Sequence, residues 1–300
     1  MGLLASKRPR RALALVAITL LGGVLTGCDP PTVACSTVTF TPPGTTARLG
    51  RLCKPDPMLH DTAILLVHGG GGVSGDRFSM QAWSQRYGVA GYLTLSIDYF
   101  LFDDNTPPPV YPVPERDVKA GVQYLRRNAA QLGIDVERIV VHGGSAGARL
   151  GAEMLVTPED PYFFGAQLWP GTPDHVNGFV GFYGPYNGAQ QDFNRYYGGP
   201  PNDPDPAVRD RWARANSVAR AGDATGPAIL FNGDADDRVP VAWMTEFEAA
   251  LDAGGQTAAA HVVPGAGHGF DRPGSASGLS TQGEAAAKKI VYWLDKKFPD

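Results

Sequence analysis

Short apolar runs recur along the chain from residue 63 onward, and longer stretches that mix polar and apolar positions separate them. Runs of this length are typical of strands that are buried on both faces of a sheet. They predict strands at Ala63–Val67, Tyr92–Ile97, Arg138–Val141, Gly178–Phe182, Ala228–Phe231 and Ala258–Val263. The stretches between and after them predict helices at Ser79–Val89, Glu115–Gln131, Ala146–Val156, Val241–Ala253 and Gly283–Phe298. This alternation predicts an α/β fold, a doubly wound and mostly parallel central sheet with helices on both faces.

The first 27 residues have a different pattern, in which one lysine and three arginines between residues 7 and 11 precede the apolar run Ala12–Thr26. This pattern predicts a signal peptide over residues 1–27, too short for a comfortable membrane span. Its ending, Leu25-Thr26-Gly27-Cys28, resembles the bacterial lipoprotein box. The resemblance implies cleavage before Cys28, a lipid on that cysteine and anchoring to the cell envelope. A plain signal peptide or an uncleaved anchor is the alternative.

A polar, proline-containing tether is expected over residues 28–34, followed by one folded domain over 35–300. Near its start, Ser36–Phe40 and Ala47–Leu52 flank a Pro-Pro-Gly turn and predict an N-terminal antiparallel hairpin. Cys35 and Cys53 lie symmetrically about Gly44 in that turn. In an exported protein they predict a disulfide across the open end of the hairpin, and two reduced thiols are the alternative.

The charge of the chain is acidic, with a formal net value of −4. Without the basic leader it moves to about −8, and no basic patch is in view, so nucleic acid is not expected as a partner.

The segment 184–226, rich in Tyr and Pro, interrupts the alternation of strands and helices. Long connections of this kind are usually functional, and this one predicts a lid or wall over the carboxyl edge of the sheet. A surface loop without a function is the alternative.

The strongest candidate for chemistry is Ser145, at the corner between the strand Arg138–Val141 and the helix Ala146–Val156. Gly143 and Gly147 bracket it in a G-x-S-x-G pattern. In such a nucleophile elbow, small neighbours let the backbone turn sharply and leave the serine hydroxyl exposed above the sheet. An ordinary glycine-rich turn with a capping serine is the alternative.

A serine nucleophile needs a base, and the base needs a carboxylate that orients it. His268 lies in a flexible Gly-His-Gly loop after the last strand and is the candidate base. The acid should lie between the two in the chain if the order is Ser, Asp, His. Asp236, in the turn after Ala228–Phe231, is the candidate, and Asp237 is its alternative.

Four consecutive glycines, residues 69–72, end the strand Ala63–Val67. Backbone amides without bulky side chains stabilise the oxyanion that acyl transfer creates, so Gly70 and Gly71 are expected to form an oxyanion hole with Ala146. A phosphate-binding loop is the competing interpretation, but the Lys-Ser/Thr ending of such a loop is not present. The chain also contains no zinc signature of the H-E-x-x-H or paired C-x-x-C type, and neither a metal nor a cofactor is expected.

Together these motifs resemble the α/β-hydrolase superfamily, in its hormone-sensitive-lipase-like carboxylesterase branch. The resemblance rests on His68-Gly69-Gly70-Gly71, Ser96-Ile97-Asp98-Tyr99, Gly143-Gly144-Ser145-Ala146-Gly147, Gly233-Asp234-Ala235-Asp236 and Gly267-His268-Gly269-Phe270, with the stretch Pro112–Gly133. It implies a cofactor-free serine esterase that acts on a small ester, either short-chain or aryl. In this branch Ser145 would attack, His268 would move the proton and Asp236 would orient the histidine.

Two other classes stay open. Peptidases of the dipeptidyl-peptidase type are similar in fold and share the triad, although they add a propeller or acidic residues that bind the peptide amine. A binding lipoprotein that resembles a hydrolase but does not catalyse is the second. The sequence names neither the physiological ester nor the oligomeric state.

Overall fold

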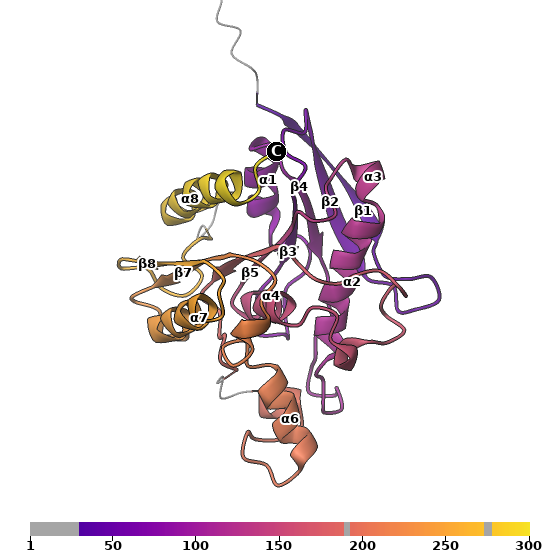
Figure 1. Cartoon of the computed structure of the whole chain (residues 1–300), viewed down its shortest axis with the longest axis vertical. Helices are drawn as coiled ribbons and strands as arrows, with labels where there is room; N and C mark the ends of the chain where they lie inside the picture. Colours follow the sequence, from indigo (N-terminus) through magenta and orange to yellow (C-terminus); the bar gives the residue numbers. More distant parts are fainter. Residues whose placement is uncertain (1–29, 189–192, 273–277) are drawn as a thin grey trace, which may run out of the picture.

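The structure, a computed structural model, describes residues 30–188, 193–272 and 278–300, so the predicted signal peptide and Cys28 lie outside it. Its centre is an eight-stranded sheet with the order β1-β2-β4-β3-β5-β6-β7-β8 (Figure 1). The strands are β1 (Thr32–Thr39), β2 (Leu49–Asp56), β3 (Ala63–Val67), β4 (Leu93–Ile97), β5 (Ile139–Gly144), β6 (Gly178–Phe182), β7 (Ala228–Gly233) and β8 (Ala258–Val263). β2 pairs antiparallel with β1 and β4, and the five remaining pairs are parallel.

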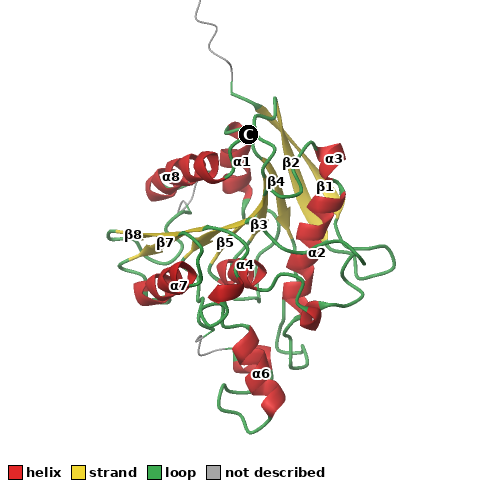
Figure 2. Cartoon of the chain, viewed as in Figure 1, coloured by secondary structure: helices red, strands yellow, loops and turns green. Residues whose placement is uncertain are grey.

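Helices cover both faces of the sheet (Figures 1 and 2). They are α1 (Gln81–Val89), α2 (Val113–Arg127), α3 (Ala129–Leu132), α4 (Ala146–Val156), α5 (Asn194–Tyr197), α6 (Pro206–Arg214), α7 (Val241–Ala253) and α8 (Thr281–Lys297), with short 3-10 turns at Pro161–Phe163 and Ala221–Asp223. Side chains alternate along a strand, and all of β3 is buried. Leu65 therefore joins the core under α2, α4 and α7, while Ile64 and Leu66 join the core under α1 and α8.

The predicted fold class and the N-terminal hairpin are confirmed. The predicted long helix is interrupted, because the Asn128 side chain donates to the Tyr124 carbonyl at 2.7 Å and separates α2 from α3. β1 begins at Thr32, so it includes the last residues of the segment expected as a tether. β5 extends to Gly144, beyond the predicted end at Val141, because its glycines still pair with β6.

The order of the strands creates the place for a site. The chain passes from β3 to β4 on one side of β3 and later returns as β5 on the other side. The connections that follow β3 and β5 thus lead to opposite sides, and the carboxyl ends of these two strands form a topological switch point, where sheets of this kind bind their ligands. The glycine run 69–72 follows β3 and Ser145 follows β5, so both candidate motifs lie at this switch point.

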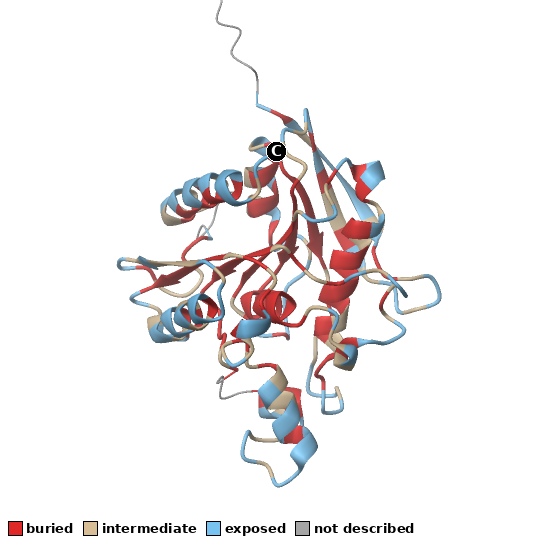
Figure 3. Cartoon of the chain, in the orientation of Figure 1, coloured by how far each residue is buried: buried red, intermediate tan, exposed pale blue. Residues whose placement is uncertain are grey.

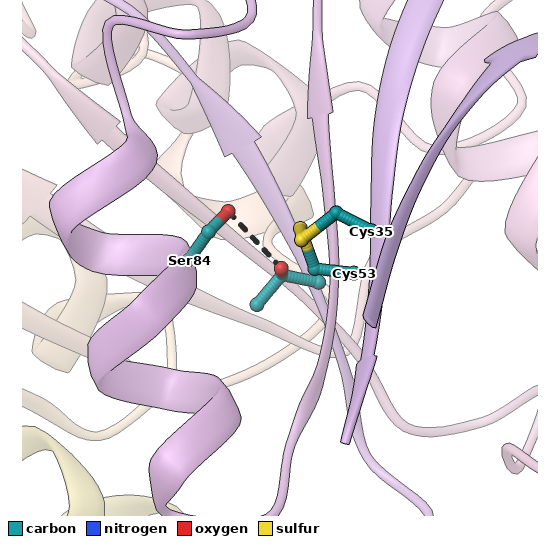
Figure 4. The surroundings of a disulfide bond; sticks show 4 residues. Cys35, Cys53 and Ser84 are labelled. Atoms are coloured by element: carbon teal, nitrogen blue, oxygen red, sulfur yellow. Dashed lines mark hydrogen bonds between the residues drawn. A yellow bond between two sulfur atoms is a disulfide. The ribbon is translucent and has the colours of Figure 1, made fainter. Parts of the chain in front are cut away.

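The predicted disulfide is confirmed between Cys35 and Cys53, which are direct partners in the β1–β2 register (Figure 4). Cys53 is fully buried. On its other side β2 pairs with β4, and there the partner of Cys53 is Thr94. The Thr94 hydroxyl donates to Ser84 Oγ of α1 at 3.1 Å. The disulfide thus closes the hairpin at the edge of the sheet where α1 packs.

In the part of the chain that the structure describes, no helix has both the length and the apolar character needed to cross a membrane.

We expect the double variant Cys35→Ala/Cys53→Ala to lose about 3 kcal/mol of unfolding free energy, because the bridge closes a short loop and restricts the unfolded chain. Guanidinium unfolding of the purified domain measures this loss. Reductant should lower the midpoint of the wild type and leave that of the variant unchanged. Equal midpoints for both proteins without reductant would contradict the prediction.

Candidate active site

Ser145 occupies a strained corner between β5 and α4. Its φ is +55° and its ψ −120°, values that a residue with a side chain rarely adopts. A Cβ on Gly143 would lie 2.2 Å from the Gly147 carbonyl oxygen, and a Cβ on Gly147 would lie 2.1 Å from that of Val67. Only glycine fits at both positions, so the two glycines predicted to bracket the serine allow the strand and helix to pass this closely.

The structure brings together the three side chains that the sequence analysis singled out. His268 Nε2 lies 3.0 Å from Ser145 Oγ, and His268 Nδ1 lies 2.9 Å from Asp236 Oδ2. The Asp236 side chain is fully buried, whereas that of His268 remains 15% exposed. This geometry lets a carboxylate hold the Nδ1–H tautomer, which leaves Nε2 free to accept a proton from the serine hydroxyl.

The choice among the three neighbouring aspartates follows from their contacts. Asp236 Oδ1 accepts from the Arg238 and Val239 amides at 2.9 and 3.0 Å, which fixes the carboxylate that faces His268. Asp234 is exposed and accepts from the Gly265 amide at 2.6 Å, so it ties the loop before the histidine to β7. Asp237 is exposed and makes no contact with His268. The geometry thus favours Asp236 over the alternative Asp237.

The glycine run after β3 has the conformations that glycine alone adopts easily. Gly70 has φ +111° and Gly71 φ +66°, and a Cβ on Gly70 would lie 2.0 Å from the Ser74 carbonyl oxygen. Among the described residues, no acceptor is bonded to the amides of Gly70, Gly71 or Ala146. Three unpaired donors next to the switch point are available to an anionic oxygen of a substrate.

Tyr183, Asp271 and Trp83 form a second set of contacts that holds the His268 loop in place. The Tyr183 ring lies 4.7 Å from the His268 ring, and its hydroxyl donates to Asp271 Oδ1. Trp83 Nε1 donates to Asp271 Oδ2 at 2.7 Å. Burial and the Asp271 carboxylate raise the pKa of Tyr183 well above its usual value, so its hydroxyl stays protonated as a donor. The His268 loop is therefore fastened to α1 and to the end of β6.

Sequence reasoning missed this support. Asp271 ends the Gly-His-Gly-Phe-Asp run that drew attention to His268, but its partners Trp83 and Tyr183 lie 188 and 88 residues away. Tyr186, three residues after Tyr183, takes no part in this support and packs in the core, with its ring 4.8 Å from that of Phe247.

Two other histidines near the glycine turns are buried and take no part in the hydrogen-bond chain. His142 lies among Trp83, Tyr87 and Phe182, and burial lowers its pKa to about 3. Burial also lowers the pKa of His68, whose Nδ1 bonds the Gly69 carbonyl at 2.7 Å. Both imidazoles are thus neutral packing groups at ordinary pH.

The segment 184–226 is anchored to the nucleophile helix. Arg149 Nη2, one turn after Ser145 in α4, donates to the Tyr196 hydroxyl at 2.9 Å. The Tyr196 carbonyl accepts from the Val110 and Tyr111 amides at 2.9 and 3.0 Å. Every residue of α4 is buried (Figure 3), so the described part of this segment is tied to a helix of the core.

Across the described ranges, no group of three or more His, Cys, Asp or Glu side chains is arranged to hold a metal ion.

With this geometry in view, comparison with known proteins gives a family. The sequence pattern of the BD-FAE family matches residues 56–251, which include the glycine run, Ser145 and Asp236. The chain belongs to the BD-FAE family. The match ends before His268, so the structure is what joins this histidine to the other two residues.

Relatives of this BD-FAE family member include two proteins of Mycobacterium tuberculosis. Esterase LipC is 32% identical over 73% of the chain and 54% of its own length, and esterase LipQ is 28% identical over 79% and 57%. The chain thus spans a little over half the length of these curated relatives.

The solved structure of the Thermogutta terrifontis esterase Est2, in its butyrate-bound form, is similar with a TM-score of 0.73 at 20% identity. The alignment covers 89% of this chain and 96% of Est2. This likeness shows the α/β-hydrolase fold that the sequence analysis expected.

We expect Asp236→Asn to lower kcat for an ester by on the order of 10³ to 10⁴-fold, because an amide in place of the carboxylate no longer selects the Nδ1–H tautomer of His268. Asp237→Asn removes the same charge one residue away and should keep nearly full activity. Steady-state kinetics on both variants, with thermal unfolding to check that they fold, measures the difference. A larger loss in Asp237→Asn would assign the acid to that residue instead.

Proposed function

We propose that this chain is a serine carboxylesterase that hydrolyses short-chain or aryl esters through an acyl-enzyme. The observation that carries the proposal is the hydrogen-bond chain from Ser145 Oγ through His268 to the buried Asp236 carboxylate, with bond lengths of 3.0 and 2.9 Å. The unpaired amides of the glycine run and of Ala146 add the second requirement of acyl transfer.

In the proposed reaction, Ser145 Oγ attacks the ester carbonyl carbon while His268 Nε2 takes its proton. The carbonyl oxygen becomes an oxyanion that accepts from the amides of Gly70, Gly71 and Ala146. Collapse of this intermediate breaks the bond to the alcohol, which leaves with the proton from His268. Water then attacks the acyl-enzyme and gives a proton to His268. When the second tetrahedral intermediate collapses, the bond between the acyl carbon and Ser145 Oγ breaks, Oγ takes the proton back from His268, and the carboxylic acid is released.

The choice of small esters has support from similar proteins. The matched mycobacterial relatives are named esterases, and Est2 was solved with propionate and with butyrate bound. The segment 184–226 is proposed as a wall of the site, because Tyr196 ties it to α4. Placement in the hormone-sensitive-lipase-like branch rests on the His-Gly-Gly-Gly run and stays part of the proposal; the chain has Gly144 where that branch usually has Asp.

The first test is hydrolysis of 4-nitrophenyl esters from acetate to palmitate by the purified domain. We expect turnover to peak at short acyl chains and to fall by on the order of 10⁵-fold in Ser145→Ala, because the nucleophile is lost. Labelling by a fluorophosphonate should require Ser145 as well. Equal turnover in wild type and Ser145→Ala would contradict the mechanism.

The same assays separate the esterase from the two alternatives, a dipeptidyl-peptidase-type enzyme and a non-catalytic binding protein. A dipeptidyl-peptidase would cleave a proline-containing peptide anilide faster than any of these esters. A non-catalytic binding protein would bind ester ligands without turnover and without labelling of Ser145. The free amides beside a serine that is already paired to a base favour a catalyst over a binding protein.

We also propose that the protein is exported and anchored to the bacterial cell envelope through a lipid on Cys28. The basic residues, the apolar run and Leu25-Thr26-Gly27-Cys28 support this, together with the disulfide, which is typical of an oxidising compartment. The domain that follows the tether then faces a compartment outside the cytoplasm.

We expect incorporation of labelled palmitate into the full-length protein expressed in a bacterial host and complete loss of the label in Cys28→Ala. Mass spectrometry of the mature protein should locate its N-terminus at Cys28. Persistence of the label in Cys28→Ala would overturn this proposal, and it would leave the esterase proposal untouched.

A further inference from the structure

Arg272, four residues after His268, brings a positive charge to the nucleophile. A Cβ built on Gly69 would lie 3.5 Å from Arg272 Nη2 and 3.3 Å from Ser145 Cβ, so both atoms border the same point at the end of β3. The residue as a whole is exposed to solvent. One nitrogen of the guanidinium therefore lies on the same side of Gly69 as the reacting serine.

This cation has no carboxylate of its own. No Asp or Glu oxygen of the described residues lies within 4.0 Å of the Arg272 guanidinium. Asp271, its neighbour in sequence, has one oxygen bonded to the Tyr183 hydroxyl and the other to Trp83 Nε1. Arg272 interacts with the neutral Tyr183 hydroxyl, which leaves its positive charge unbalanced and suited to pair with a charge on the substrate.

Arg272 also lines a pocket whose described lining residues include none of Ser145, His268, Gly70 and Gly71, so this arginine connects the pocket with the site. The pocket has a volume of about 340 Å³, and Arg272 and Asp271 form one part of its lining while Phe78, Gln81 and Gln85 form another. Among the described residues that line the pocket, Arg272 is the one cationic side chain. The pocket thus offers space, polar amides and an aromatic ring next to a positive charge.

The far edge of the same pocket is also basic. The guanidinium carbons of Arg51 and Arg77 lie 5.9 and 4.7 Å from the centre of the Phe78 ring. Arg77 is neutralised by Asp98 at 2.6 Å, but Arg51 forms no ion pair with a described residue, and its Nη1 is buried without a hydrogen-bond partner. Positive charge therefore flanks the pocket on two sides although the chain is acidic overall.

We infer that the preferred substrates are esters that carry a carboxylate close to the scissile bond, and that the Arg272 guanidinium binds this carboxylate beside Ser145. The inference rests on the proposed esterase function and narrows its substrate class. This carboxylate belongs either to the acid part or to the alcohol part of the ester. Each of these two positions is tested with its own pair of model esters.

Two pairs of probes test these sources. For the alcohol part, 4-acetoxybenzoate is compared with its methyl ester; for the acid part, 4-nitrophenyl hydrogen adipate is compared with its methyl ester. Each pair differs by one negative charge, and the readout is the ratio of kcat/KM for the anionic ester to that for the neutral ester. Because intrinsic reactivity is the same for every enzyme variant, a change in this ratio reports recognition of the charge.

In at least one pair we expect Arg272→Gln to lower the ratio by about tenfold, because a charge-assisted hydrogen bond is lost. Arg272→Lys keeps the charge without the planar fork and should restore part of the ratio. Arg127→Gln removes the same charge from the exposed end of α2 and should leave the ratio unchanged. Added salt should lower the wild-type ratio toward that of Arg272→Gln.

An unchanged ratio in Arg272→Gln for both pairs would overturn the inference, as would an equal decrease in Arg127→Gln, which would point to the overall charge instead. In both cases hydrolysis of the neutral esters would leave the esterase proposal standing. Absence of hydrolysis for all four esters, with Ser145 inert to fluorophosphonate, would instead overturn the proposed function itself, and the inference with it.

Discussion

The close approach of backbones at the end of β5 is the constraint on which the rest of the site depends. Because Gly143 and Gly147 have no side chains, α4 begins almost in contact with the end of β3. The chain can make this turn only if the residue between them takes a positive φ, and that residue is Ser145. The strained corner lifts the hydroxyl above the sheet and places the start of α4 at the switch point, so one packing constraint positions both the nucleophile and the free Ala146 amide.

Sheet topology then brings the other groups to this corner. Asp236 follows β7 and His268 follows β8, and both strands run parallel to β5. Their carboxyl ends therefore meet at one edge, although the residues are 32 and 123 positions apart along the two hydrogen bonds. The Asp234 bond to the Gly265 amide and the Asp271 bonds to Trp83 and Tyr183 hold the histidine loop against that edge. Such support limits the positions that the base can adopt.

Much of this arrangement could be predicted from the sequence, for reasons that are local. Strand positions follow from apolar runs, the disulfide from the symmetry of Cys35 and Cys53 about a turn, and the candidate triad from three short motifs in the expected order. The interruption at Asn128 depends on one side chain that bonds a carbonyl within the helix, which periodicity does not reveal. The partners of Asp271 and the position of Arg272 depend on how distant loops pack, and no spacing in the sequence encodes those contacts.

A buried ionic network under the nucleophile helix explains how the segment 184–226 is held. Arg149 Nη1 contacts Glu115 Oε1 at 3.0 Å and Glu153 Oε1 at 2.6 Å, and Tyr196 donates to Glu115 Oε1 at 2.6 Å. Burial raises the pKa of Glu153 well above its usual range, and although Arg149 opposes this rise, the Glu115 carboxylate adds to it.

Two adjacent carboxyl groups and one guanidinium are therefore best balanced when Glu153 keeps its proton, because the network is then neutral overall. A neutral, hydrogen-bonded network can remain in the core where an unpaired charge could not. Since Tyr196 completes it from the far segment, release of that segment would expose Glu115 and Arg149 without one of their partners. The energetic cost of that exposure favours a fixed position for Tyr196 and its neighbours over one that opens freely.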